Sequence, residues 1–362
     1  MIDRICISIN NRCNLACSYC HFHEKGEIEA AEMDVYEILD HVKEYIRKGY
    51  VGKGYTGEGC TGKEYSGEGC AGKGYAGEGC TGKGYAGKEY AEEGCTGKGH
   101  AEEGYAGKGY AGEGYTGKQF KIGFVGNGEC FLDWQALKSY IAYLEDASGI
   151  SLYTITNGTV RLPDEDLAFL GKHKVNVGFS IDGYKELHDR YRCNSFDRAM
   201  ENVERYRQVT GHYPTFNATV GRESLRNAEE VISFFKPFGT KVTFSRMIGK
   251  YGISLEEYRD FISMAEKEIP VRRNCSGAAS GTGHPGQAWQ RVTPEAETGP
   301  DCTMYGGLCG AGKNNYFFAN GKVYYCGNCI DLPPVGDSSM SFEELERISL
   351  TFDRNYCYKE SL

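Results

Sequence analysis

The sequence predicts an α/β protein: a partial barrel of six parallel strands with intervening helices, followed by a small cysteine-rich module. Two observations carry this prediction. Apolar runs alternate with amphipathic runs along most of the chain, and cysteines gather after the first apolar run and again near the C-terminus. Alternating strands and helices form a parallel sheet with right-handed crossovers. Functional residues of such folds collect at the carboxyl ends of the strands.

Each expected strand is a short apolar run, and each expected helix has apolar residues at helical spacing. The expected strands span residues 5–9, 120–125, 152–156, 175–180, 215–220 and 241–245. The expected helices span residues 33–48, 133–146, 163–172, 195–209, 226–236 and 254–267. These six strand–helix pairs are the units of a (β/α)6 barrel.

A low-complexity repeat interrupts this pattern at residues 51–118. A pentapeptide of Ala, Thr or Ser, then Gly, then Lys or Glu, then Gly or Glu, then Tyr or Cys recurs, and the stretch holds 23 of the 50 glycines. It contains no Leu, Ile or Phe, so it cannot offset the entropy of ordering. We expect a flexible, dispensable insertion on the N-terminal face of the sheet; a Tyr-rich tether for a partner is the functional alternative.

Composition narrows the possible partners and location. The formal net charge of -9 argues against nucleic acid. The N-terminus lacks a signal-peptide pattern and no apolar run is long enough for a membrane span, so we expect a cytoplasmic protein without membrane contact. Sixteen cysteines in a reducing compartment indicate metal or redox chemistry rather than disulfides.

The predicted domains follow these patterns. They are a core barrel at 1–250 interrupted by 51–118, a helix and linker at 251–300, and the cysteine-rich module at 301–362. Within the module, Asn320-Gly321 predicts a hairpin with strands at 317–319 and 322–325. Ser341 with Glu344 predicts a capped helix at 341–350.

Three cysteines, Cys13, Cys17 and Cys20, lie on one short segment after the first strand. Three thiolates can bind three irons of a cubane iron–sulfur cluster and leave the fourth iron open to an outside ligand. The alternatives are a zinc site completed by His21 or His23, or three unrelated buried cysteines.

This Cys-x3-Cys-x2-Cys segment resembles the signature of the radical S-adenosylmethionine (SAM) superfamily. The resemblance implies a [4Fe-4S] cluster whose open iron binds SAM. It also implies reductive cleavage of SAM to a 5′-deoxyadenosyl radical that abstracts hydrogen from a substrate, with an electron donor such as ferredoxin or flavodoxin.

The resemblance extends to the ends of the next strands. Gly128 and Glu129 look like the family segment that receives the SAM amino group, although Asn127 and Cys130 depart from its usual form. By the same resemblance, Ser180 lies near the SAM ribose and Arg192 near its carboxylate. The further cofactor-binding residues expected at strand ends are Asn157 and Asp182.

Local explanations stay open for two of these matches. Asn157-Gly158 is also an ordinary turn sequence. Asp189 and Arg192 could form a surface ion pair that contributes little to stability.

The second cysteine group consists of Cys302, Cys309, Cys326 and Cys329. It looks like the twitch module, the shortened relative of the SPASM module, of radical SAM peptide maturases. The resemblance implies one auxiliary [4Fe-4S] cluster. Cys275 and Cys357 are left over, and a zinc ribbon is the alternative.

The resemblance therefore predicts a radical SAM enzyme that modifies a ribosomally made peptide or protein. One alternative is an enzyme of small-molecule or cofactor biosynthesis. The other is a zinc-binding structural or interaction protein dominated by the repeat.

Overall fold

The computed structural model describes residues 2–20, 22, 31–49, 119–247, 249–272, 311–312, 314–330 and 332–349. The chain divides into two compact units. The first comprises Val42–Phe120 and Ser148–Ile150, with Met1, and in it the ring of Tyr45 packs edge-on against Phe120. The second comprises Ile2–His41, Lys121–Ala147 and Ser151–Leu362, and all residues of the candidate site belong to it.

The described strands form one sheet in the order β6-β5-β4-β3-β2-β1-β7-β8-β9. They are β1 (Arg4–Ile7), β2 (Phe120–Phe124), β3 (Ile150–Thr156), β4 (Asn176–Ser180), β5 (Thr215–Val220), β6 (Val242–Arg246), β7 (Asn315–Ala319), β8 (Lys322–Tyr324) and β9 (Gly336–Asp337). The register pairs β1 with β2, β3 with β4, β4 with β5 and β5 with β6 in parallel. The six predicted strands are thus confirmed, with small shifts at their ends.

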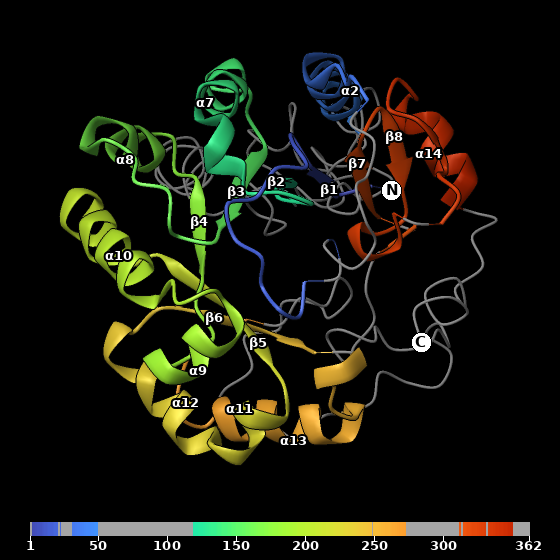
Figure 1. Cartoon of the computed structure of the whole chain (residues 1–362). Helices are drawn as coiled ribbons and strands as arrows, with labels where there is room; N and C mark the ends of the chain where they lie inside the picture. The colour runs from blue at the N-terminus through green and yellow to red at the C-terminus, as the bar shows by residue number, and fades with distance from the viewer. Residues whose placement is uncertain are drawn as a thin grey trace, which may run out of the picture. The chain divides into compact units, whose positions relative to one another are not determined.

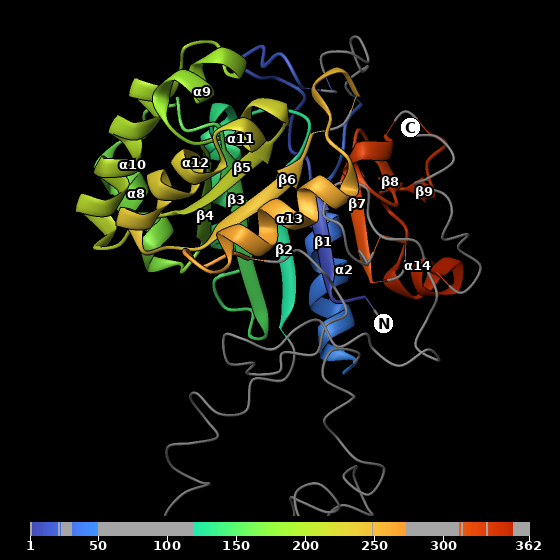
Figure 2. The ribbon, with the colours of Figure 1, turned by 90° about the horizontal axis from the view of Figure 1, so that it is seen from below.

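The helices and 3-10 turns follow the strands in the expected alternation. They are α2 (Val35–Arg47), η4 (Cys130–Asp133), α7 (Trp134–Tyr143), α8 (Asp164–Lys172), α9 (Lys185–Tyr191), α10 (Phe196–Thr210), α11 (Arg222–Arg226), α12 (Ala228–Phe235), η5 (Lys236–Phe238), η6 (Gly249–Tyr251), α13 (Leu255–Ala265), η7 (Gly327–Cys329) and α14 (Phe342–Ser349). The sheet curves, and α7, α8, α10 and α12 lie on its outer side (Figures 1 and 2). This arrangement is the predicted partial α/β barrel.

Local sequence explains these elements. Helix α10 buries Ala199, Val203 and Tyr206, which are four and three residues apart and so share one face. It ends at Gly211, whose φ of 83° places it in the left-handed region that glycine adopts freely. In β2 and β5 the buried apolar side chains stand at alternate positions, so they share one face of each strand.

Two elements differ from the expectation. The expected helix at 226–236 forms as α12, which begins after Asn227, whose backbone leaves the helical region; the short helix α11 before it was not expected. Helix α9 was not expected, because seven residues are too few to show a periodic pattern.

The C-terminal hairpin is confirmed, and Asn320 and Gly321 both have positive φ values in its turn. Strand β7 also pairs in parallel with β1, so the hairpin continues the main sheet. The predicted cap of α14 is confirmed as well: Ser341 N donates to Glu344 Oε2 (2.9 Å), and Glu344 N donates to Ser341 Oγ (3.3 Å).

Several expectations lie outside the described residues. These are the repeat at 51–118, residues 273–300 of the predicted linker, and Cys275, Cys302, Cys309 and Cys357. Within the part of the chain that the structure describes, no helix has the length and apolar character needed to cross a membrane.

Candidate active site

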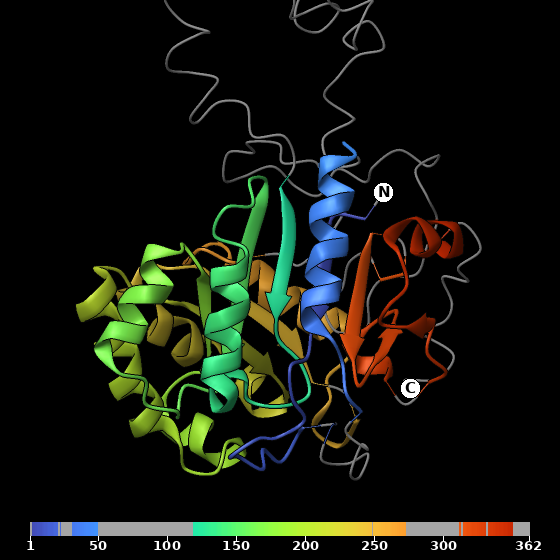
Figure 3. The same ribbon diagram turned by 90° about the horizontal axis from the view of Figure 1, so that it is seen from above.

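The cysteine-bearing segment, residues 8–20, follows β1 directly and lies beyond the carboxyl ends of the parallel strands. Figure 3 shows this blue segment past the arrowhead of β2, and Figure 1 shows it within the curve of the sheet. The direction of the parallel strands therefore places the three cysteines at the edge where such folds carry their sites.

Two glycines after β2 allow this segment to pack closely. A Cβ atom on Gly128 would lie 2.0 Å from Asn10 Oδ1 and 2.3 Å from the carbonyl oxygen of Arg12. A Cβ atom on Gly126 would lie 2.3 Å from Ser8 Cβ. Gly128, which the resemblance assigns to cofactor contact, thus packs against the cysteine-bearing segment in this structure.

Asparagines fix the same segment at several points. Asn10 Nδ2 donates to the carbonyl oxygen of Glu129 (3.1 Å), and the Asn10 carboxamide oxygen accepts from Arg12 N (3.0 Å). Asn11 accepts at Oδ1 from Asn127 Nδ2 (3.1 Å) and donates from Nδ2 to Asn320 Oδ1 (2.7 Å). The segment is therefore bonded to the ends of β2 and β7.

A third asparagine joins the segment to the end of β3. Asn14 Oδ1 accepts from Asn157 Nδ2 (2.8 Å), and Asn14 Nδ2 donates to Thr159 Oγ1 (2.9 Å). The Asn157 amide also lies 3.8 Å from the sulfur of Cys13. Asn157-Gly158 forms a bend in which Thr159 N donates to Asn157 Oδ1 (2.9 Å), and the Asn157 side chain also lies beside the first cysteine.

Glu129 binds the ends of β2 and β3 together. Its side chain is 2% exposed. Oε1 accepts from Thr156 Oγ1 (2.7 Å) and Phe131 N (3.0 Å), while Oε2 accepts from Asn157 N (2.6 Å). Burial raises the pKa of this carboxyl, and the hydrogen bonds from Asn157, Thr156 and Phe131 oppose that shift.

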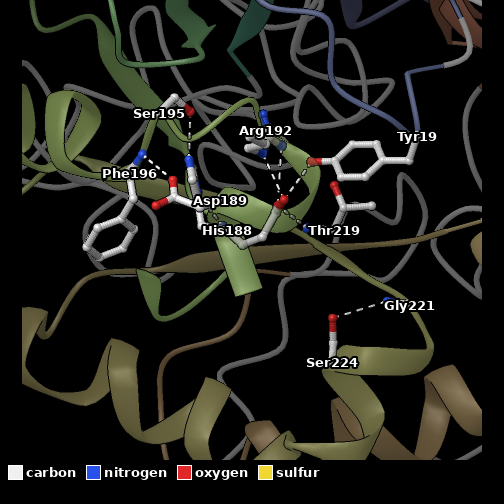
Figure 4. A network of polar contacts seen from close by, with 10 residues as sticks. Tyr19, His188, Asp189, Arg192, Ser195, Phe196, Thr219, Gly221 and Ser224 are labelled. Carbon is white, nitrogen blue, oxygen red and sulfur yellow. Dashed lines mark hydrogen bonds and ion pairs between the residues drawn. The ribbon is translucent and has the colours of Figure 1, made fainter. Parts of the chain in front are cut away.

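A buried ion pair holds the other end of the cysteine segment. Asp182 Oδ2 accepts from Arg192 Nε (2.8 Å) and from the Tyr19 hydroxyl (2.7 Å), and Oδ1 accepts from Thr219 N (2.9 Å). Figure 4 shows Tyr19, Arg192 and Thr219 converging on this carboxylate. Burial acts to raise the pKa of Asp182, but the charge and hydrogen bonds of Arg192 outweigh it and lower the pKa.

Arg192 also stacks on the segment. Its guanidinium carbon lies 5.3 Å from the centroid of the Tyr19 ring, a cation–π contact. The surface ion pair considered between Asp189 and Arg192 is not the one that forms. Asp189 instead pairs with Lys185 (2.9 Å) and accepts from Phe196 N (2.9 Å).

His188 is hydrogen-bonded to the backbone of Asp182, one partner of this ion pair. Its Nδ1 accepts from Asp182 N (3.4 Å), so Nε2 carries the proton and donates to Ser195 Oγ (2.9 Å). Burial lowers the pKa of His188 to about 4. The imidazole is therefore neutral at pH 7.

The three thiols influence one another. The pKa of Cys17 is raised to about 12, mainly by burial and also by the negative charges of Asp182, Cys20 and Cys13; Arg192 opposes this shift. The pKa of Cys13 is likewise raised by burial, with smaller contributions that include Glu129 and Cys20. Thiolates at these positions consequently need a positive partner such as bound iron.

The structure thus brings most of the predicted residues together. Gly128, Glu129, Asn157, Asp182 and Arg192 all contact the cysteine segment or one another, while Ser180 is half-buried at the end of β4. The supporting residues that sequence reasoning missed are Asn10, Asn11 and Asn14. Three asparagines within five residues of a cysteine motif were the available signal.

The C-terminal cysteines are only partly described. Cys326 Sγ accepts from Asn328 N (3.5 Å), and the charge of Cys326 adds to the burial that raises the pKa of Cys6. Cys329 ends the turn η7. Among the described residues, no three His, Cys, Asp or Glu side chains are gathered as ligands of a single metal ion.

No protein family model matches the chain. Part of the chain is 33% identical over 87 residues to a cysteine-type anaerobic sulfatase-maturating enzyme of Clostridium novyi (strain NT). The match spans 22% of this chain and 22% of that protein.

Solved structures have a similar fold. The anaerobic sulfatase-maturating enzyme anSMEcpe with bound AdoMet aligns with a TM-score of 0.56 and 16% identity, covering 97% of this chain and 84% of that one. Streptococcus suis SuiB bound to its precursor peptide SuiA aligns with a TM-score of 0.55 and 11% identity, covering 100% and 66%. The chain therefore has the partial-barrel fold of these structures. It resembles the SPASM/twitch-type radical SAM peptide-modifying enzymes.

Proposed function

We propose that this chain is a radical SAM enzyme that reductively cleaves SAM and abstracts hydrogen from a peptide or protein. The observation that carries the proposal is the cysteine segment itself. It lies at the carboxyl edge of a partial barrel, bonded to the end of β3 through Asn14 and to Asp182, after β4, through Tyr19.

The described residues fit an iron–sulfur cluster. Cys13, Cys17 and Cys20 supply three thiols on one segment, and Cys13 is exposed. A cluster bound to them would leave one iron for SAM and would supply the electron that splits SAM to a 5′-deoxyadenosyl radical.

The surrounding side chains position and charge this site. Arg192 lowers the pKa of Cys17 against the effect of burial, so it favours the thiolate that iron requires. Asp182 holds the guanidinium in place through two hydrogen bonds, to Nε and Nη2. Glu129, Asn157 and Ser180 at neighbouring strand ends are the proposed contacts of SAM, together with Gly128, Asp182 and Arg192.

The proposed substrate class is supported by two structural neighbours. One is anSMEcpe with bound AdoMet and the Cp18Cys peptide, and the other is SuiB bound to SuiA. We further propose one auxiliary cluster on Cys302, Cys309, Cys326 and Cys329, and an electron donor such as ferredoxin or flavodoxin.

The proposal is tested by reconstituting the full chain anaerobically with iron and sulfide and incubating it with SAM and dithionite. We expect 5′-deoxyadenosine from the wild type and none from Cys17→Ser, which removes one cluster ligand. Cys193→Ser is the matched control, because Cys193 is exposed and lies outside the cysteine segment.

Metal analysis of the same preparations separates the alternatives. About four irons per chain lost on Cys17→Ser would support a four-iron cluster on the segment. Tightly bound zinc without iron, and no 5′-deoxyadenosine, would contradict the proposal and favour a zinc-binding protein.

A further inference from the structure

A cavity of about 490 Å³ opens beside the cysteine segment, on its α9 and α11 side. Ser18, which lies between Cys17 and Cys20, forms part of its wall. Ser18 N donates to the carbonyl oxygen of Tyr191, another wall residue (2.9 Å). The cavity is therefore joined to the proposed cluster site by direct backbone bonding.

The cavity is strongly basic. Its walls include Arg190, Arg222, Arg226 and Lys250, against one carboxylate, Glu223. All four basic residues are exposed. This leaves an excess of three positive charges in a chain whose net charge is -9. Clefts lined by charge of one sign focus the field and attract ligands of opposite charge.

Glu223 is the one carboxylate among the lining residues, and it lies beside two of the arginine side chains. Glu223 Oε1 accepts from Arg226 Nη1 (2.7 Å) and lies 3.7 Å from Arg190 Nη1. Arg222 is oriented separately, because its Nε donates to the carbonyl oxygen of Gly252 (3.2 Å). Two guanidinium groups therefore share one carboxylate, and a third is held by a backbone carbonyl.

Two tyrosine side chains, Tyr191 and Tyr251, form part of the cavity wall. The rings of Tyr191 and Tyr251 meet edge-to-face at 5.3 Å, and the Tyr191 ring lies 5.8 Å from that of Tyr19. Tyrosine faces pack against peptide backbone and apolar stems. A concave site of this volume suits a small ligand or a short chain segment rather than the convex surface of a folded electron-donor protein.

We infer that this cavity binds a carboxylate-rich segment of the substrate peptide and holds it next to the cysteine segment. The inference rests on the proposed function and specifies its substrate: a peptide with acidic residues near the modified position. Arginine guanidinium groups bind carboxylates with two parallel hydrogen bonds, which gives orientation as well as attraction.

The test measures binding without turnover. A fluorescein-labelled hexapeptide of alternating glycine and glutamate is titrated with the full, reconstituted protein at low salt, and anisotropy gives Kd. The equivalent glycine–lysine peptide is the charge control. We expect the acidic peptide alone to bind, and Arg226→Glu with Lys250→Glu to weaken it about tenfold, since each exposed ion pair contributes modestly.

A matched double variant controls for net charge. Arg198→Glu with Lys241→Glu makes the same change at exposed positions that do not line the cavity, and we expect it to leave Kd within about twofold. Equal weakening by both double variants, or binding of both peptides alike, would overturn the inference. So would cavity-dependent binding of flavodoxin with no binding of the acidic peptide.

Failure of the inference is distinguishable from failure of the proposed function. SAM cleavage without peptide is measured on the same wild-type preparation. 5′-Deoxyadenosine without peptide binding would overturn the cavity's role alone, whereas peptide binding without SAM cleavage would contradict the enzyme proposal.

Discussion

Asp182 connects three parts of the site through one buried carboxylate. It accepts hydrogen bonds from Tyr19 on the cysteine segment, from Arg192 after α9 and from Thr219 on β5. The carboxylate is 1% exposed, so its charge depends on Arg192 for compensation. The position of the last cysteine thus depends on a residue more than 160 positions away in the sequence.

Replacing Asp182 by Asn should leave the buried Arg192 guanidinium without a counter-charge. We expect the free energy of unfolding to fall by about 3–5 kcal/mol, as when one partner of a buried ion pair is removed. Urea unfolding measures the change. Glu201→Gln removes the partner of Arg161 in an exposed ion pair and should cost less than about 1 kcal/mol. Equal losses in the two variants would show that Asp182 does not hold a buried charge.

His188 should make stability depend on pH. Its pKa is about 4 in the folded chain against an ordinary value of 6.5, because burial disfavours the charged form. The unfolded chain therefore takes up the proton first as the pH falls. Stability should be complete above pH 6.5 and decline between pH 6.5 and 4, by at most about 3 kcal/mol.

The check compares urea unfolding of the wild type and His188→Gln at pH 7.5 and pH 5. The variant lacks the titrating group, so its loss on acidification should be smaller than that of the wild type. Identical losses would mean that His188 is protonated in the folded chain.

Among the structural elements, the loop after β2 packs closely against the loop after β1. Gly128 allows the backbone at Arg12 to approach closely, and Glu129 N donates to the carbonyl oxygen of Arg12 (2.7 Å). The cysteine motif is thus held by a neighbouring loop as well as by its own side chains.

Gly128→Ala should displace the cysteine segment, because its Cβ would lie 2.0 Å from Asn10 Oδ1 and 2.3 Å from backbone. We expect a loss of about 1–3 kcal/mol in stability and a lower iron content after reconstitution. Gly171→Ala is the control: its Cβ would meet only Thr210 at 3.5 Å, and alanine favours the helix. Full iron content in Gly128→Ala would contradict the close fit.

At the scale of the whole molecule, the strands and most helices could be predicted because each has a local apolar pattern. The positions of Glu129, Asn157 and Arg192 beside the cysteine segment could be expected only through the family resemblance. Local patterns could not show that Arg192 pairs with Asp182, because the choice between Asp182 and Asp189 depends on how α9 packs. Nor could they show that β7 joins β1, since pairing between strands more than 300 residues apart leaves no trace in either strand.

The repeat at 51–118 interrupts the chain between α2 and β2. Because the repeat contributes none of the proposed site residues, a chain with these residues deleted should fold and should form 5′-deoxyadenosine within about twofold of the full chain. A folded deletion variant that binds iron but does not cleave SAM would show that the repeat belongs to the site.

We propose that the three cysteines hold a cluster with one iron open to SAM. Electron paramagnetic resonance of the reconstituted, dithionite-reduced protein tests it directly, with and without SAM. We predict a reduced four-iron component whose g values shift when SAM is added and which is missing from Cys17→Ser, whereas the component of an auxiliary cluster should be unaffected by either change. A spectrum in which no component responds to SAM, or a spectrum that is identical in the wild type and Cys17→Ser, would contradict a cluster with an open iron on this segment.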